Sequence, residues 1–237
     1  MVKEKLFRNV VSNLVIILIL VSLIFIGFSN DVISVFSHNG NSAIYRGNSN
    51  EKNVSLMINV YWGEEYIDEF ISILNKYNSK ATFFVGGCYV AKNEKILHSI
   101  LNSGNEIGNH GYYHKDCTTL SDDRIREEIT ITHSLVKQIT GYEMTLFAPP
   151  SGAVNENTCL IAGELNYKTI MWSKDTIDWR DKDSNLIYNR AIKNPQNGDL
   201  ILMHPSKETL MAFEKIVSFY VDLGFNVTTV SKNIQNL

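Results

Sequence analysis

Residues 104–114 read Gly-Asn-Glu-Ile-Gly-Asn-His-Gly-Tyr-Tyr-His, a short strand-like run that ends in two histidines. We expect a strand over 106–109, followed by His110 and His114 at i, i+4 spacing. On a helical turn this spacing places both imidazoles on one face, as in two-histidine zinc sites. The six histidines of the chain also produce such a spacing by chance, so structural histidines are the alternative. The position at a strand end favours metal ligands.

The sequence on both sides of this stretch alternates β-rich runs with amphipathic helical runs. In 64–77, for example, Ile67, Phe70 and Leu74 recur at helical spacing. Repeated β-then-α units predict an α/β fold with a parallel sheet, and about seven to eight strands fit either an open sheet or a compact, distorted (β/α) barrel. The expected strands are 54–60, 81–85, 106–109, 145–148, 169–172, 200–203 and 226–230, and the expected helices are 64–77, 93–101, 121–141, 155–165, 184–192 and 208–223.

The N-terminus carries the pattern of one transmembrane helix. Lys3, Lys5 and Arg8 precede an uncharged run over 10–28. As a helix this run spans about 28 Å, close to the hydrocarbon thickness of a bilayer. The basic flank predicts that 1–9 stay in the cytoplasm and that the rest of a single-pass cell-membrane protein is extracytoplasmic. A cleaved signal peptide, which would release a secreted domain, is the alternative.

The remainder of the chain divides into two expected parts. Residues 29–52 are rich in Asn, Ser and Gly and predict a polar linker, and residues 53–237 are long enough for one well-cored domain. The net charge of -3 and the lack of a basic stripe exclude a nucleic-acid-binding surface. The three cysteines form no CxxC pair, so neither a cysteine-only metal site nor a disulfide framework is expected, although one bridge stays open.

Polar and aromatic residues gather where the expected strands end, and in βα folds ligands bind at these carboxyl ends. Asp178 and His204 follow two such strands and could form an acid pair, in which the carboxylate orients and charges the imidazole. A cap or a loop hydrogen bond is the alternative for Asp178. Trp62 and Trp179 lie near the same rim, where aromatic faces suit sugar rings, although tryptophans are more often part of a core.

Four stretches taken together resemble the polysaccharide deacetylases, also called the NodB-homology domain or carbohydrate esterase family four (CE4). The stretch 80–86 looks like the second strand of the family, and 104–114 is similar to its metal-histidine motif. Residues 175–179 and 202–205 resemble its fourth and fifth motifs. All four occur in the family's order, and the resemblance covers 54–230.

The resemblance implies a distorted (β/α) barrel and a hydrolase, a polysaccharide deacetylase that removes acetyl groups from a cell-wall polysaccharide such as peptidoglycan. It also implies a divalent metal, commonly zinc, held in part by His110 and His114. His204, charged by Asp178, would then protonate the leaving amine. The expected partners are therefore the cell-wall glycan and, through the anchor, the membrane.

Two motifs depart from the family pattern. The first family motif reads T-F-D-D-G, whereas this chain has Asn-Val-Tyr-Trp-Gly over 59–63. Tyr61 stands at the position of the family's general base, and Trp62 at that of a metal-ligating aspartate. The third motif usually carries R-x-P-Y, whose arginine holds the base, and here 148–151 read Ala-Pro-Pro-Ser. The base aspartate and the arginine that would hold it are therefore absent together. This is physically consistent, because an arginine without its carboxylate is a costly unpaired charge. Both departures resemble a sporulation-linked subgroup of the family.

Two functions are compatible with this pattern. We predict a metal-dependent deacetylase whose third ligand comes from Glu64 or Glu65, with Asn59 or Ser151 as weaker candidates. The alternative is a catalytically impaired glycan-binding or cell-wall assembly protein, because a missing general base costs about 10²–10⁴-fold in rate. In both functions the residues expected to contact the glycan are Tyr61, Trp62, Pro150, Ser151 and Trp179.

Overall fold

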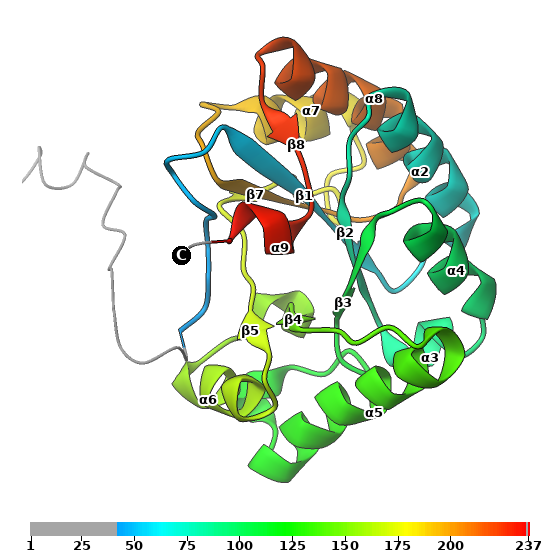
Figure 1. Ribbon diagram of the computed structural model, residues 1–237, viewed down its shortest axis with the longest axis vertical. Helices are drawn as coiled ribbons and strands as arrows, with labels where there is room; N and C mark the ends of the chain where they lie inside the picture. The colour runs from blue at the N-terminus through cyan, green and yellow to red at the C-terminus, as the bar shows by residue number, and fades with distance from the viewer. Residues whose placement is uncertain (1–41, 236) are drawn as a thin grey trace, which may run out of the picture. The chain divides into compact units, whose positions relative to one another are not determined.

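The computed structural model describes residues 42–235 and residue 237 (Figure 1). Within them no helix is long and apolar enough to cross a bilayer. The expected transmembrane helix 10–28, its flank 1–9 and the first part of the expected linker lie outside the described residues. The anchor therefore stays a prediction.

One sheet of eight parallel strands forms the centre of the domain. The sheet curls, and the longer helices lie on its outer side (Figure 1). This arrangement confirms the expected α/β fold with a parallel sheet. Among the described residues, however, the sheet is a curled half-barrel and not a closed barrel, because its edge strands, Lys168–Thr169 and Lys174–Asp175, do not pair with each other. The strand order is β5-β4-β3-β2-β1-β7-β6, with β8 beside β1. The strands are β1 (Asn53–Val60), β2 (Thr82–Val85), β3 (Glu106–Asn109), β4 (Leu146–Phe147), β5 (Lys168–Thr169), β6 (Lys174–Asp175), β7 (Asp199–Met203) and β8 (Asn226–Val227).

The sheet has a hydrophobic cluster on each face. In β1, Leu56 and Ile58 pack with helix residues such as Phe70, whereas Met57 belongs to an inner cluster with Phe84. Neighbouring side chains of a strand point to opposite faces, so both faces of the sheet are buried. The helices are α2 (Ile67–Lys76), α3 (Gly87–Val90), α4 (Glu94–Asn102), α5 (Asp122–Thr140), α6 (Glu156–Glu164), α7 (Ser184–Ile192), α8 (Lys207–Asp222) and α9 (Val230–Asn233), with 3-10 turns η1 (Glu64–Tyr66), η2 (Cys117–Thr119) and η3 (Pro150–Gly152).

The last strand pairs with the amino-terminal end of the first. Asn53 and Val54 of β1 pair with Asn226 and Val227 of β8, while the carboxyl-terminal half of β1 pairs with β2. The short helix α9 follows, and its Val230 joins the inner cluster. Helix α9 thus fills the interior of the curled sheet where the strands begin (Figure 1). A ligand site is left to the opposite end, where the strands finish.

Residues 43–48, which we call the strap, belong to the expected polar linker but pack along the edge of the sheet. The N–H of Ile44 donates to the carbonyl of Thr169 at 2.8 Å, and the Ile44 carbonyl accepts from Met171 N–H at 2.8 Å. The described part of the linker is therefore held against the domain. Composition alone could not reveal this, because the strap is held by backbone hydrogen bonds and by an ion pair to Asp199, which is distant in sequence.

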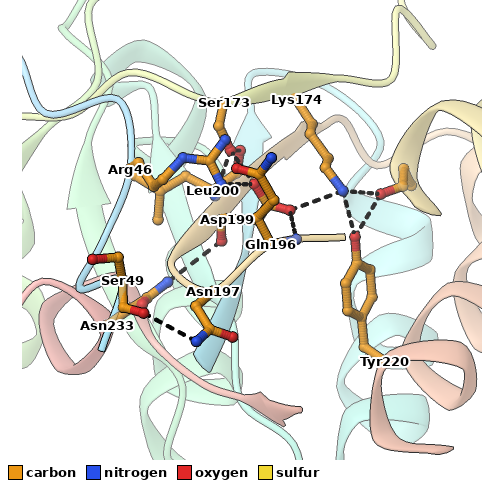
Figure 2. Close-up of polar contacts among 11 residues, drawn as sticks. Arg46, Ser49, Ser173, Lys174, Gln196, Asn197, Asp199, Leu200, Tyr220 and Asn233 are labelled. Atoms are coloured by element: carbon orange, nitrogen blue, oxygen red, sulfur yellow. Dashed lines mark hydrogen bonds and ion pairs between the residues drawn. The ribbon is translucent and has the colours of Figure 1, made fainter. Parts of the chain in front are cut away.

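A buried carboxylate fastens the strap (Figure 2). Asp199 is fully buried and pairs with Arg46 of the strap and with Lys174 of β6, whose Nζ lies 2.8 Å from Asp199 Oδ2. The Ser173 hydroxyl and the Gln196 N–H also donate to Asp199, each at 2.9 Å. Burial lowers the pKa of Lys174, and the adjacent carboxylate opposes that shift. Asp199 thus joins the strap to two neighbouring strands.

The expected strand 169–172 is wrong in its extent, and β6 was not expected. Strand β5 ends at Thr169, and Met171 pairs with the strap instead of continuing β5. The chain then reaches the opposite edge of the sheet, where β6 pairs with β7. One stretch of eight residues, 168–175, therefore serves both edges of the sheet, and side-chain periodicity does not reveal such a crossing.

Candidate active site

The end of β1 places Tyr61, Trp62 and Gly63 at the carboxyl-terminal rim of the sheet. Gly63 has a φ of 79°, and a Cβ at this position would lie 1.8 Å from the carbonyl oxygen of Pro205. Only glycine fits this left-handed turn against that backbone. The turn brings Trp62 over His204, with ring centroids 5.1 Å apart and planes within 9°. Trp62 thus covers one face of the His204 imidazole and remains 43% exposed.

The structure brings Asp178 and His204 together as the sequence predicts. His204 Nδ1 lies 2.7 Å from Asp178 Oδ1, and the His204 N–H donates to Oδ2 at 2.6 Å. Thr209 also donates its hydroxyl proton to Oδ2 at 2.7 Å. Because Asp178 engages Nδ1, the Nε2 atom of His204 is the one left for a ligand. The role of this pair as a general acid stays a prediction.

His110 and His114 lie side by side, with ring centroids 5.0 Å apart. His110 is buried, and its Nδ1 lies 2.7 Å from the carbonyl oxygen of Ala148, so Nδ1 carries the proton and Nε2 is a free acceptor. Burial, assisted by the neighbouring His114, lowers the pKa of His110 to about 3. Burial also lowers the pKa of His114. Both imidazoles are thus kept neutral, the form in which histidine binds metals.

Tyr61 occupies the position beside His114. The two ring centroids are 4.7 Å apart, and the other side of the Tyr61 ring lies against Gly86, where a Cβ would be 2.4 Å from Tyr61 Cδ2. Burial raises the pKa of the Tyr61 phenol. A phenol that stays protonated at neutral pH does not replace a carboxylate as a general base.

The donor set does not fit a zinc site as it stands. In residues 42–235 and 237, no group of three or more His, Cys, Asp or Glu side chains is arranged to hold a metal ion. The expected third ligands, Glu64 and Glu65, are exposed in η1, and Glu64 lines a surface groove with Lys92. Neither glutamate joins the two histidines in a metal-binding group among the described residues. Two neutral imidazoles without an anionic partner bind zinc weakly.

The other residues predicted to contact a glycan take different positions around the rim. Pro150 is buried, Ser151 is exposed, and Trp179 is 56% exposed next to Asp178. Asn59 lies in β1, two residues before Tyr61, and is buried. Within the described residues its Oδ1 accepts no hydrogen bond. Such an orphaned acceptor is uncommon in a folded protein and is available to a ligand N–H or O–H.

Three residues that shape the rim were missed by sequence reasoning: Asn109, Glu128 and Thr209. Asn109 and Glu128 accept hydrogen bonds from the backbone of 111–113. Glu128 lies in a helix rich in charged residues, where a carboxylate reads as a solvated side chain, yet it is only 2% exposed. No local pattern distinguishes a buried glutamate of this kind from its exposed neighbours.

The curled parallel sheet, the adjacent histidines and the Asp178–His204 pair define a protein of the polysaccharide deacetylase class. A polysaccharide deacetylase family model matches residues 46–170, and the chain belongs to this family. It is 38% identical over 189 residues to uncharacterized protein YlxY of Bacillus subtilis, covering 80% of this chain and 59% of YlxY. It is 30% identical over 190 residues to a peptidoglycan-N-acetylglucosamine deacetylase of Bacillus cereus, covering 78% of this chain and 89% of that protein.

The similar solved structures include a protein without activity. Wild-type BA3943 from Bacillus anthracis, a CE4 family pseudoenzyme, has a TM-score of 0.80 at 34% identity, covering 83% of this chain and 70% of that chain. A BA3943 mutant with restored enzymatic activity also has a TM-score of 0.80, at 33% identity, covering 83% and 72%. The family resemblance is thus shared with deacetylases and with a pseudoenzyme.

Proposed function

We propose that this chain is a cell-wall glycan-binding protein that keeps the polysaccharide deacetylase fold and does not hydrolyse its ligand. The observation that carries the proposal is the position of two aromatic rings at the end of β1. Tyr61 lies against His114, and Trp62 lies against His204. These are the positions at which the family pattern has its base and a metal-ligating carboxylate.

The loss of both carboxylates removes two separate contributions to catalysis. Without a base, the attacking water loses a factor of about 10²–10⁴ in rate. Without an anionic ligand, the two imidazoles lack the charge and the third donor that catalytic zinc sites use. We therefore favour binding over the hydrolase expected from the sequence.

The ligand we propose is peptidoglycan, because a relative with 30% identity is a peptidoglycan deacetylase. Three aromatic side chains, Trp62, Tyr113 and Trp179, are 43%, 49% and 56% exposed. Aromatic faces of this kind line the sites of many ring-shaped ligands. We also propose that the domain lies at the outer face of the cell membrane and that residues 10–28 anchor it there. The altered first and third motifs, which resemble those of the sporulation-linked subgroup, support a role in sporulation.

Binding and hydrolysis can be separated with purified peptidoglycan sacculi and the full chain. We expect the wild type to co-sediment with sacculi and to release no acetate. Trp62→Asp should allow equimolar zinc to bind, and Tyr61→Asp combined with Trp62→Asp should release acetate. Met211→Asp, a change at an exposed position of α8, is the matched control. It should neither bind equimolar zinc nor release acetate.

The second candidate is the metal-dependent deacetylase itself, and the intact Asp178–His204 pair favours it. Asp178 accepts three hydrogen bonds, two of them from His204, and this arrangement orients the imidazole as a general acid requires. Acetate release by the wild type that disappears in His110→Ala would establish this candidate and refute the binding-only proposal.

A further inference from the structure

The loop over 110–114, which we call the histidine loop, has a backbone shape that it cannot hold by itself. Gly111 has a φ of 74° and His114 a φ of 56°. Such left-handed conformations are unfavourable for residues other than glycine, and for His114 the surroundings must supply the compensation. Besides the histidines the loop carries Tyr112, whose ring packs against Gly87, and the exposed Tyr113, so the shape of the loop decides how Tyr113 reaches a ligand.

Three consecutive N–H groups of the loop point inward to two buried acceptors. Gly111 N–H donates to Asn109 Oδ1 at 2.9 Å. The N–H groups of Tyr112 and Tyr113 both donate to Glu128 Oε2, each at 2.7 Å. Successive N–H groups that converge in this way form a concave anion-binding surface. Here the anion is a carboxylate of the protein's own helix α5.

Glu128 is buried, and from the described residues it accepts hydrogen bonds through only one of its two carboxylate oxygens, the one that faces the loop. It is 2% exposed, and its Oε1 accepts no hydrogen bond within the described part of the chain. A buried carboxylate normally pairs with a cation or fills its acceptor sites. A Cβ on Gly111 would lie 3.0 Å from Oε2, so the loop and the carboxylate are in close contact.

Asn109 holds the same loop from the other side. Its Nδ2 donates to the carbonyl of Ile129 at 2.8 Å and to the Tyr167 hydroxyl at 3.3 Å, which fixes the amide with Oδ1 facing Gly111. The Tyr167 oxygen lies 2.6 Å from His133 Nδ1. The Tyr167 hydroxyl thus links the Asn109 amide to His133.

We propose that Glu128 is a positioning residue that sets the shape of the histidine loop and thereby presents the exposed Tyr113 to the glycan. The ligand part of this inference rests on the proposed function. Glu128 acts through the acceptor oxygen that receives two backbone N–H groups. Asn109 supplies the third acceptor, and helix α3 receives the loop on its far side, where Gly87 and Cys88 N–H groups bind the Gly111 and Tyr112 carbonyls at 2.9 and 3.0 Å.

The decisive comparison is between Glu128→Gln and Glu128→Leu in the full chain. Glutamine keeps one oxygen that can accept both N–H groups, whereas leucine has nearly the same size and no acceptor. Amide hydrogen exchange, read residue by residue by NMR, should become about 10- to 100-fold faster at Tyr112 and Tyr113 in Glu128→Leu. Exchange should change little in Glu128→Gln. Glu127→Leu is the matched control, because Glu127 is exposed on the same helix and pairs with Arg124.

Sacculus binding provides the second measurement. We expect Glu128→Leu to bind sacculi about tenfold more weakly or worse, and Glu128→Gln to recover the affinity of the wild type. Unchanged exchange at Tyr112 and Tyr113 in Glu128→Leu would overturn the positioning role, as would a Glu128→Gln variant as impaired as Glu128→Leu. If the wild type binds no sacculi, the proposed function is refuted, and the exchange experiment still decides whether Glu128 positions the loop.

Discussion

Replacing Asp199 with asparagine should destabilise the domain far more than removing the charge of either cation that it binds. Asp199 is fully buried, while the side chains of Arg46 and Lys174 are 26% and 11% exposed. Without the carboxylate, two cations are left beside each other, and Lys174 has little access to water. Breaking a buried pair in this way costs about 3 to 5 kcal/mol.

Arg46→Gln is the matched change on the other side of the pair. It leaves Asp199 with Lys174, the Ser173 hydroxyl and the Gln196 N–H, so the carboxylate stays satisfied. The half-buried arginine is partly hydrated, and we expect a loss of about 1 to 2 kcal/mol. The double variant should be less destabilised than the sum of the two single variants, because it leaves only one unpaired cation.

Urea unfolding followed by circular dichroism measures these differences directly. Equal losses for Asp199→Asn and Arg46→Gln would refute the reasoning, since they would mean that burial does not distinguish the partners. So would losses below about 1 kcal/mol for both variants, because the cluster would then behave as an exposed ion pair.

Two further predictions concern the rim and the network behind it. Gly63→Ala should cost about 2 kcal/mol or more in unfolding free energy, because its Cβ would meet the Pro205 carbonyl; Gly141→Ala has a similar φ of 75° with nothing within 4 Å and should lose only about 1 kcal/mol. Burial raises the pKa of Tyr167 to about 12 from 10.0, so between these values the unfolded chain has lost a proton that the folded chain keeps. The stability of the wild type should therefore fall as pH rises through this window, by up to about 1.4 kcal/mol per pH unit from this group. In Tyr167→Phe that component is absent, and parallel stability–pH curves for the two proteins would contradict the assignment.

The parallel α/β fold could be predicted because its signals are local and repeated. The regions of the longer helices α2, α5 and α8 were recognisable from apolar spacing, and Gly141 ends α5 in the left-handed conformation expected of a helix stop. Strands of only two residues, such as β5 and β6, were misjudged because their hydrogen bonds, and not their side chains, define them. The strap was missed for the same reason.

The candidate site was predictable where it depends on residue type at strand ends. Asp178 and His204 meet as expected, and His110 lies beside His114. The expected contribution of Glu64 or Glu65 was wrong, because it depends on the direction of the chain after Gly63. Glu128 could not be recognised from the sequence, since its contacts arise from burial against the loop 15 to 16 residues before it.

The pairing of β8 with β1 also has a consequence for how the chain acquires its structure. The amino-terminal end of β1 pairs with β7 on one side, and on its other side it has no strand beside it until residues 226–227 have been synthesised. Contacts between such distant parts of a chain form slowly, because a large loop must close first. A nascent chain that lacks its last residues therefore cannot complete its inner hydrophobic cluster, and it exposes apolar surface to chaperones until synthesis is nearly finished.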